Sequence, residues 1–456
     1  MNIFDFNSNL CTIRSSSYNI ENGILNLKPN NETSWVCFSN VSVLAKENIR
    51  IKMKVKADID VSSQDKRFVL HYTTDIDPEF HIYKTVPAWF KYAKVENDGW
   101  YELEFDVPQF RQWKSTVTNL HFEFCDVNGE IYIESIWFVK ADKLADSSHD
   151  NLTKLGYVGT RLLQDEHFER GFYVPQFEQK KNFKHGLWQD YCNTEEKPLW
   201  QIAPWWSRYD LWDNRDTSKG KYTLADIYGV NSVTYHPDEK YISMQQNAVN
   251  VFEGKPHIPS EYNWWPHLLI EQNDEFCDFD KKRNTAAADR MFIEIDVRVS
   301  DFKDTINTEG KNHVSYMIYF YLMTDKAPNK RIWFGLDLLL DLDGDDKTHI
   351  IWHPDTAARQ FMYKIPPAVV FGSIENSLNP KKGIVVTDGK WKNVRVDITP
   401  HLDRAVEWAN RDNAYGVSVT KEDLYFSGVN IGFEISGNYD CTIDFKNFNM
   451  VSYNKE

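Results

Sequence analysis

Two glutamates in the sequence lie where a carboxylate could act on a bound substrate. Glu271 follows the apolar stretch in "NWWPHLLIEQ", and Glu434 lies in the middle of "IGFEISG". Cleavage of a glycosidic bond normally uses two carboxyl groups, one as acid and one as base or nucleophile. Their separation is roughly 5–5.5 Å for retention and roughly 6.5–9.5 Å for inversion. We therefore take Glu271 as the first choice for one catalytic partner, and Glu434 or Asp341 as the other.

Tryptophans are concentrated in the stretch 199–213 and again just before Glu271. The flat faces of indole rings suit sugar rings, and nearby polar groups such as Arg208 and His267 could bind sugar hydroxyls. The alternative is that the same tryptophans only pack a large loop onto a sheet. The stretch "PWWSRYDLWD" contains proline and has no regular period, so we expect a loop, where binding residues tend to lie. The predicted stacking residues are Trp205, Trp206, Trp212, Trp264 and Trp265.

Histidines and closely spaced aspartates offer further chemistry. His353 precedes a proline and lies two residues before Asp355, so a His–Asp pair could orient a proton transfer, although His353 could equally cap a turn. The run "DLDGDD" contains Asp341, Asp343 and Asp345, whose oxygens could bind Ca²⁺. It lacks the full EF-hand pattern, and a plain acidic turn is the alternative. We expect no required cofactor; a structural calcium is the one metal that the pattern suggests.

Apolar residues recur at every second position along most of the chain, which is the period of a half-buried strand. Helical periodicity is scarce, and its best example is residues 401–410, opened by Pro400. Many strands and few helices predict an all-β protein made of antiparallel β-sandwiches. The predicted strands include residues 49–61, 100–107, 129–139, 291–299, 313–323 and 394–398.

A polar stretch at residues 140–156 predicts a linker between domain 1–142 and a larger domain 157–456. Both domains end alike. An Asp-Gly turn precedes a Trp-led strand, a strand with "FE" at its centre follows, and a last strand closes the domain. We therefore expect two copies of one topology, the second enlarged by insertions between Arg161 and Asn284. This repeat weakens Glu434 as a catalytic candidate, because Glu123 occupies the same place in the first domain.

These closing strands resemble the C-terminal half of jelly-roll carbohydrate-binding modules. The matching residues are Trp100, Asp106, Phe122, Ile133 and Glu134 in the first domain, and Trp391, Asp397, Phe433, Glu434, Ile443 and Asp444 in the second. The larger domain also resembles β-sandwich domains of bacterial proteins encoded near glycan-degrading enzymes. The resemblance implies two jelly-roll sandwiches, an accessory carbohydrate-binding domain first and the main cleft in the second.

Composition excludes several classes of partner and chemistry. The net charge is −15 and the predicted pI is 5.4, so nucleic acid and anionic membranes are not expected partners. Motifs of phosphate loops, dinucleotide-binding turns, zincins and α/β-hydrolases are missing. The six cysteines form no C-x-x-C pair. Without a visible signal peptide we expect a cytoplasmic protein; a secreted protein with its signal removed is the alternative.

The sequence thus predicts a carbohydrate-active protein. A glycoside hydrolase with a carboxylate pair in an aromatic-lined cleft is the first hypothesis. The second is a glycan-binding protein with the same cleft and no catalysis. The third is a structural or assembly protein whose exposed aromatics form a subunit interface, so an oligomer remains open.

Overall fold

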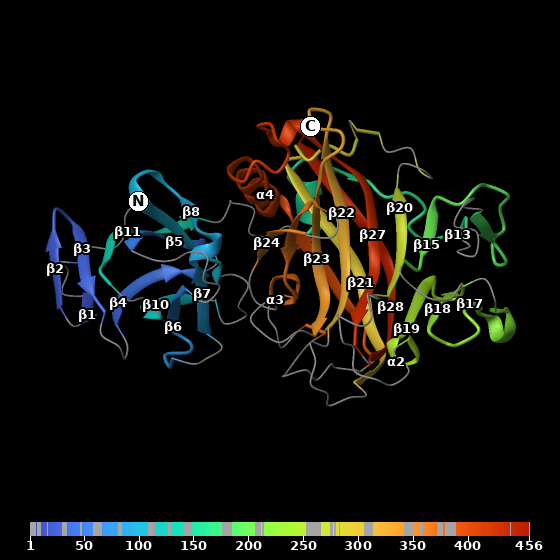
Figure 1. The fold of residues 1–456 in the computed structure, drawn as a ribbon, viewed down its shortest axis with the longest axis horizontal. Coiled ribbons are helices and arrows are strands. Elements are labelled where there is room, and N and C mark those ends of the chain that lie inside the picture. The colour runs from blue at the N-terminus through green and yellow to red at the C-terminus, as the bar shows by residue number, and fades with distance from the viewer. Residues whose placement is uncertain are drawn as a thin grey trace. The chain divides into compact units, whose positions relative to one another are not determined.

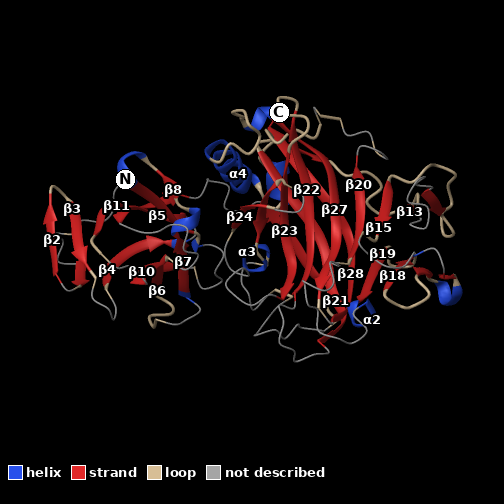
Figure 2. Ribbon diagram, in the orientation of Figure 1, coloured by secondary structure: helices blue, strands red, loops and turns tan. Residues whose placement is uncertain are grey.

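The structure is a computed structural model of the 456-residue chain. It describes residues 6, 11–15, 17–29, 34–45, 48–57, 66–80, 84–107, 113, 115–125, 129–140, 148–175, 185–205, 211, 214–251, 266–273, 277, 280–281, 283–304, 313–341, 350–355, 359–371, 377–378, 389–437 and 439–455. The chain forms two compact units, Met1–Asp146 and Ser147–Glu456. Nearly all regular structure in the described residues is strand (Figure 2).

The smaller unit is a sandwich of two antiparallel sheets (Figure 1). One sheet has the strand order β1-β4-β10-β6-β7, and the other has the order β2-β3-β11-β5-β9-β8. The bounds are β1 Cys11–Arg14, β2 Ser17–Glu21, β3 Ile24–Lys28, β4 Trp35–Leu44, β5 Asn48–Ala57, β6 Arg67–Thr74, β7 Thr85–Trp89, β8 Lys94–Val95, β9 Trp100–Phe105, β10 Thr116–Cys125 and β11 Ile131–Lys140.

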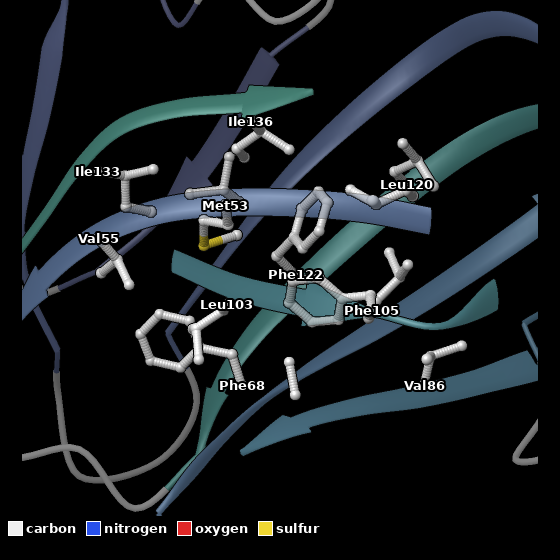
Figure 3. Close-up of a cluster of buried hydrophobic side chains, with 14 of the residues drawn as sticks. Met53, Val55, Phe68, Val86, Leu103, Phe105, Leu120, Phe122, Ile133 and Ile136 are labelled. Carbon is white, nitrogen blue, oxygen red and sulfur yellow. The ribbon is translucent and has the colours of Figure 1, made fainter. Parts of the chain in front are cut away.

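Alternate residues of these strands meet between the two sheets, as the sequence pattern predicts. Phe122 of β10 and Phe105 of β9 come from opposite sheets and lie edge to face at 5.4 Å (Figure 3). Met53 and Leu103 are fully buried beside them. Burying a side chain of this size stabilises the fold by about 1.5–3 kcal/mol. The intervening residues of the same strands face outward, where a ligand could reach them.

The larger unit is a second sandwich. Its first sheet has the order β16-β17-β18-β19-β28-β21-β26, with β12 also pairing with β28, and its second has the order β14-β13-β15-β20-β27-β22-β23-β25-β24. We call these the β28 sheet and the β27 sheet. The bounds are β12 Tyr157–Arg161, β13 Phe172–Pro175, β14 His185–Trp188, β15 Trp200–Ala203, β16 Asn214–Asp216, β17 Tyr222–Ala225, β18 Asn231–His236, β19 Tyr241–Asn247, β20 His267–Asn273, β21 Arg290–Asp304, β22 His313–Thr324, β23 Arg331–Asp341, β24 Ile351–Pro354, β25 Phe361–Ile365, β26 Lys392–Asp397, β27 Leu424–Ser436 and β28 Tyr439–Lys455.

The two units share one topology. In the smaller unit the order β2-β3-β11-β5-β9 matches β18-β19-β28-β21-β26 of the larger one, and β1-β4-β10-β6-β7 matches β15-β20-β27-β22-β23. Matched strands follow each other in the same chain order, and the paired neighbours are antiparallel in both units. The prediction of two copies of one sandwich is therefore confirmed. Glu123 and Glu434 lie on matched strands, β10 and β27.

Helices are few and peripheral. They are α1 His149–Lys154, α2 Ala248–Val251, α3 Pro367–Val370 and α4 Thr399–Arg411, with short 3-10 turns between strands. The longest, α4, contains the predicted helix at 401–410. Pro400 lies in its first turn, where a missing N–H costs nothing. It buries Leu402, Ala405 and Trp408 on one face.

The all-β prediction of two antiparallel sandwiches is confirmed. The larger unit carries additional strands, of which β13, β14, β16 and β17 lie in the predicted insertion region between Arg161 and Asn284. The additional strands β12, β24 and β25 lie outside that region or at its edge, so the predicted location of the enlargement is only partly correct. Two strand pairs of the larger unit, β13–β15 and β23–β25, are parallel, which alternation alone does not predict. Among the described residues, no helix is long and apolar enough to cross a membrane.

Candidate functional site

The outer face of the β27 sheet collects most of the described residues that the sequence singled out. On β20, Leu268 and Ile270 are fully buried between the two sheets, so His267, Leu269 and Glu271 point the other way. The register places His267 opposite Glu434 on β27. Both predicted glutamates therefore lie on one face of one sheet.

Glu271 is enclosed in a fixed set of hydrogen bonds. The side chain is 6% exposed. The Gln201 amide donates to one carboxylate oxygen at 2.6 Å, and the Trp205 indole N–H donates to the other at 3.1 Å. Burial raises the pKa of Glu271, while the two hydrogen bonds and the charge of Arg331 act against that rise. Both oxygens of Glu271 already have donors within the protein.

Glu434 is more open. Its side chain is 21% exposed, and that of the neighbouring His267 is 19% exposed, with 3.8 Å between His267 Nε2 and Glu434 Oε1. On the other side of β27, the register pairs Glu434 with Ser315 of β22. Glu434 is therefore the predicted carboxylate on this face that can meet a ligand directly.

Glu271 and Glu434 are separated along the strands. Glu434 lies opposite His267, which precedes Glu271 by four positions on β20. At about 3.3 Å per residue, this offset places the two residues about 13 Å apart along the strand direction. This separation is larger than the roughly 6.5–9.5 Å between the carboxyl groups of an inverting pair. It is larger still than the roughly 5–5.5 Å of a retaining pair. Glu271 is also held by Gln201 and Trp205 rather than directed at Glu434.

A buried ion pair lies next to Glu434. Lys364 Nζ of β25 is 3.0 Å from Asp337 Oδ2 of β23; their side chains are 12% and 0% exposed. The Ser315 hydroxyl donates to Asp337 Oδ1 at 3.3 Å. Burial opposes the charge of Lys364, but Asp337, Tyr319 and Glu434 outweigh burial and raise the pKa of Lys364 above its ordinary value. A fixed positive charge therefore lies within the electrostatic range of Glu434.

Aromatic and apolar side chains fill the space around these polar groups. Ala203, Leu269, Met317 and Tyr319 form a buried cluster separate from the main core, and three partly exposed side chains pack against it, Trp205, Trp333 and Met362. Both tryptophans pack against this second cluster, and the Trp205 indole is also held by its hydrogen bond to Glu271. The face therefore combines packed indoles with a few oriented polar groups, the composition typical of ligand sites.

Two glycines let tyrosine rings lie close against the sheet. A Cβ on Gly335 would lie 2.0 Å from the Ile318 carbonyl oxygen and 2.6 Å from the Tyr319 ring, and one on Gly428 would lie 2.7 Å from the Tyr321 ring. The Tyr321 ring also carries the Arg331 guanidinium at 5.0 Å. Tyr321, half-buried, is thus a further aromatic on this face.

The remaining predicted site residues are distributed as follows. His353 lies exposed on β24, with its Nδ1 atom 3.1 Å from the Pro354 carbonyl oxygen. In the strand register it lies opposite Met362 of β25. Asp341 is the last residue of β23, but its side chain is outside the described residues. Within the described ranges no group of three His, Cys, Asp or Glu side chains is arranged to hold a metal. Outside the described residues lie Trp206, Arg208, Trp212, Trp264, Trp265, Asp343 and Asp345.

Several residues of this face were not predicted from the sequence: Gln201, Tyr321, Trp333 and Lys364. Trp333 and Asp337 are on one face of β23, and their spacing in "RIWFGLDLLLD" gives that alternation. The signal was present in the sequence, but it does not say which face of the strand is the outer one. Lys364 has no signal, because its partner Asp337 is reached only through the parallel pairing of β23 with β25.

The matched face of the smaller unit has its own polar and aromatic row. His121 of β10 lies between Cys37 of β4 and His71 of β6 in the register. The Trp35 ring is 4.8 Å from the His121 ring, and His71 Nε2 is 3.0 Å from Glu123 Oε2. Burial lowers the pKa of His121 to about 4, with a further contribution from His71 that Glu123 opposes.

No protein-family model and no curated protein matches the chain. Among solved structures, a low-affinity xylan-binding module from Roseburia intestinalis is similar at 9% identity, with 29% of this chain and 90% of that chain covered and a TM-score of 0.20. A mutant of a family 29 carbohydrate-binding module is similar at 14% identity over 33% and 96%, with a TM-score of 0.22. An endoglucanase from Rhodothermus marinus is similar at 10% identity over 54% and 98%, with a TM-score of 0.27. Likenesses at this level assign no residue and no activity to this chain.

Proposed function

We propose that the protein is carbohydrate-active and that its larger unit binds a glycan across the outer face of the β27 sheet. The observation that carries the proposal is the conjunction of partly exposed, immobilised aromatic rings with oriented polar groups on that face. Trp205 and Trp333 pack against the second apolar cluster, and Glu434 and His267 are partly exposed further along the same face.

The chemistry of a sugar chain suits this arrangement. A sugar ring has an apolar C–H face that packs on an indole, and a rim of hydroxyls that need donors and acceptors. Glu434 supplies an acceptor, and His267 supplies a donor or an acceptor according to its tautomer. Because Trp205 is tied to Glu271 through its N–H, its ring is ordered before a ligand arrives, which lowers the entropy lost on binding.

Binding is tested by affinity electrophoresis and calorimetry with a panel of soluble polysaccharides. We expect Trp333→Ala to weaken binding to any glycan found in the panel by about tenfold or more, as loss of a buried aromatic anchor does. Tyr228→Ala is the matched control, because Tyr228 is a 56% exposed aromatic of the same unit in the turn between β17 and β18 of the other sheet. Equal affinity of the Trp333→Ala and wild-type proteins would place the glycan elsewhere.

Glycoside hydrolysis is the second candidate, and the exposure of Glu434 favours it. Glu434 as general acid or base, with His267 beside it, provides one half of the chemistry. Asp337 accepts a hydrogen bond from Ser315, the residue beside Glu434 on β22. It is already paired with Lys364. Glu271 serves better as the residue that positions Trp205 than as the catalytic partner.

Release of reducing ends separates hydrolysis from binding alone. On a glycan that wild-type protein cleaves, Glu434→Gln is expected to lower the rate by about 10² to 10⁴, the contribution of a general acid or base, while affinity changes little. Glu271→Gln should retain most of the rate. Binding without any released reducing ends across the panel would leave the protein a glycan-binding protein.

We further propose that the smaller unit is an accessory glycan-binding module, acting through the face that contains Trp35, His71, His121 and Glu123. In the intact chain, Trp35→Ala should weaken binding to a polymer more than binding to a short oligosaccharide, because only a polymer can engage both units at once.

A further inference from the structure

The opposite face of the larger sandwich contains a cavity. Strands β18, β19, β28 and β21 present their outward residues to a cavity of about 420 Å³. This volume is within the range of small-molecule sites. On these strands Val233, Met244 and Ile443 are buried between the sheets, so the cavity lies on the outer side of the β28 sheet.

Hydroxyl groups supply much of the cavity wall: Ser232, Thr234, Ser243, Ser300 and Thr442. The register brings them side by side, with Thr234 opposite Ser243 and Ser243 opposite Asp444. Ser232, Thr234 and Ser243 already bond to Gln245, Thr223 and Asp444 within the sheet. Each hydroxyl oxygen can still accept a hydrogen bond from a ligand. A wall of this kind matches a ligand that carries several hydroxyls of its own.

The charges in the wall have an excess of cations. Asp444, which is 2% exposed, accepts from Arg298 Nε at 2.7 Å and from the Ser243 hydroxyl at 2.5 Å. Arg298 therefore balances the one carboxylate. Lys221 adds a second cation at the exposed rim. Burial lowers the pKa of His236; the charge of Asp444 opposes this fall, and the charges of Lys221 and Arg298 add to it.

Aromatic rings hold the Arg298 side chain in place. The Arg298 guanidinium lies over the Trp391 ring at 4.4 Å and over the Tyr241 ring at 5.1 Å. Tyr241 in turn stacks on His236, with 4.0 Å between ring centres and an angle of 7° between planes. The guanidinium is thus fixed by a carboxylate and two rings before a ligand binds.

The matched face of the smaller unit is built differently. There Lys52 of β5 is paired with Glu102 and Glu104 of β9 at 2.6 and 2.9 Å, so its charge is already balanced within the sheet. In the larger unit Arg298 of the matched strand β21 is likewise paired, with Asp444, but it lies in the wall of a cavity that the exposed Lys221 also lines. Lys221 is thus the cation that distinguishes this wall.

We propose that this cavity binds a sugar acid, a polyhydroxylated ring that carries one carboxylate, either free or as the terminal uronic acid of a glycan. Lys221, with Arg298 behind it, receives the carboxylate, and the wall of serines and threonines receives the ring hydroxyls. The site is on the sheet opposite to the proposed glycan face, and it does not depend on that proposal.

The test is calorimetry and saturation-transfer NMR of the full chain with D-glucuronate, D-glucose and inorganic phosphate. We expect glucuronate to bind more tightly than glucose and phosphate, and its affinity to fall as salt increases. Lys221→Gln should weaken glucuronate by about five- to tenfold, the loss of one charge-assisted contact, and leave glucose unchanged. A glucuronate-terminated oligosaccharide that binds more tightly than the free acid identifies a glycan end as the ligand, and equal affinity identifies the free acid.

Lys221 is exposed, so its replacement leaves the fold intact. Lys240→Gln is the matched control, because Lys240 is an exposed lysine between β18 and β19 whose partner is Glu169. A second variant, Thr442→Val, keeps the shape of the wall and removes one hydroxyl; it should weaken glucuronate and glucose alike. The proposal is overturned if glucuronate fails to bind at millimolar concentration, if phosphate binds as well as glucuronate, or if Lys221→Gln and Lys240→Gln have equal effects. Trp333→Ala should leave glucuronate binding unchanged, which separates this site from the glycan face.

Discussion

Replacement of Lys364 by methionine would test the arrangement on the β27 sheet most directly. Methionine keeps most of the volume of the side chain but removes the charge 3.0 Å from Asp337, which has no solvent exposure. The Ser315 hydroxyl, at 3.3 Å, remains as a donor to Asp337. Removing one partner of a buried ion pair costs about 3–5 kcal/mol, because the other charge is left without compensation. We expect the larger unit to lose this much free energy of unfolding near pH 8.

The loss should depend on pH with a defined sign. Without Lys364, burial raises the pKa of Asp337 in the folded state above its value in the unfolded chain. The penalty is then absent below about pH 4, where the carboxyl is protonated in both states. It grows by at most about 1.4 kcal/mol per pH unit as the pH rises, so it needs about two to four units to develop fully. Urea unfolding at a series of pH values from 4 to 8 measures this directly.

Two variants make the measurement decisive. The double variant Asp337→Leu, Lys364→Met removes both charges and should recover stability to within about 1 kcal/mol of wild type, or exceed it. Lys326→Met removes a lysine that is 50% exposed and paired with Asp423 at 2.7 Å, and should cost at most about 1 kcal/mol. If Lys364→Met cost no more than Lys326→Met and showed no pH dependence, Asp337 and Lys364 would not form a buried ion pair. The conclusion that a fixed positive charge lies near Glu434 would then be wrong.

Two further predictions follow from the two units. Gly335→Ala should destabilise the larger unit by about 1–3 kcal/mol in urea unfolding, because its Cβ would lie 2.0 Å from the Ile318 carbonyl oxygen; a stability equal to wild type would contradict the close approach of β22 and β23. In the smaller unit, the pKa of His121 is lowered from its ordinary 6.5 to about 4, so the unfolded chain binds more protons between these values and stability should fall as the pH drops through that window. His121→Phe should remove this part of the pH dependence, and thermal melts at pH 4.5 and 7 compare the two proteins.

The strands could be predicted from sequence because alternation is a local property. The pattern at residues 313–323 gives β22, observed as His313–Thr324, and both ends were set by where alternation stops. The repeated ending also predicted that Glu123 and Glu434 lie on matched strands, and the common strand order of the two units confirms it. Such information is carried by neighbouring residues and needs no knowledge of distant contacts.

The contacts of the site could not be predicted in the same way. Glu271 receives its hydrogen bonds from Gln201 and Trp205, which lie 70 and 66 positions earlier in the chain. Those residues reach it only because β15 pairs with β20, and a shift of one residue in that pairing would turn Gln201 to the other face. The sequence places Glu271 after an apolar stretch, and the structure places it inside β20, two residues before the strand ends at Asn273. Whether its carboxylate is free to act depends on this register.

The register also limits how the β27 face could hydrolyse a glycan. The residues directly beside Glu434 on its two neighbouring strands are His267 and Ser315, and neither is a carboxylate. Glu271 is about 13 Å further along β20, a distance that suits two contacts on an extended chain rather than two groups at one bond. The segment from His267 to Glu271 therefore forms one row of an extended face, with the partly exposed pair His267 and Glu434 at one end and the tryptophan-bound carboxylate of Glu271 at the other. Hydrolysis on this face would require Glu434 to act with a carboxylate from another strand or loop, whereas binding requires nothing beyond the groups already in place.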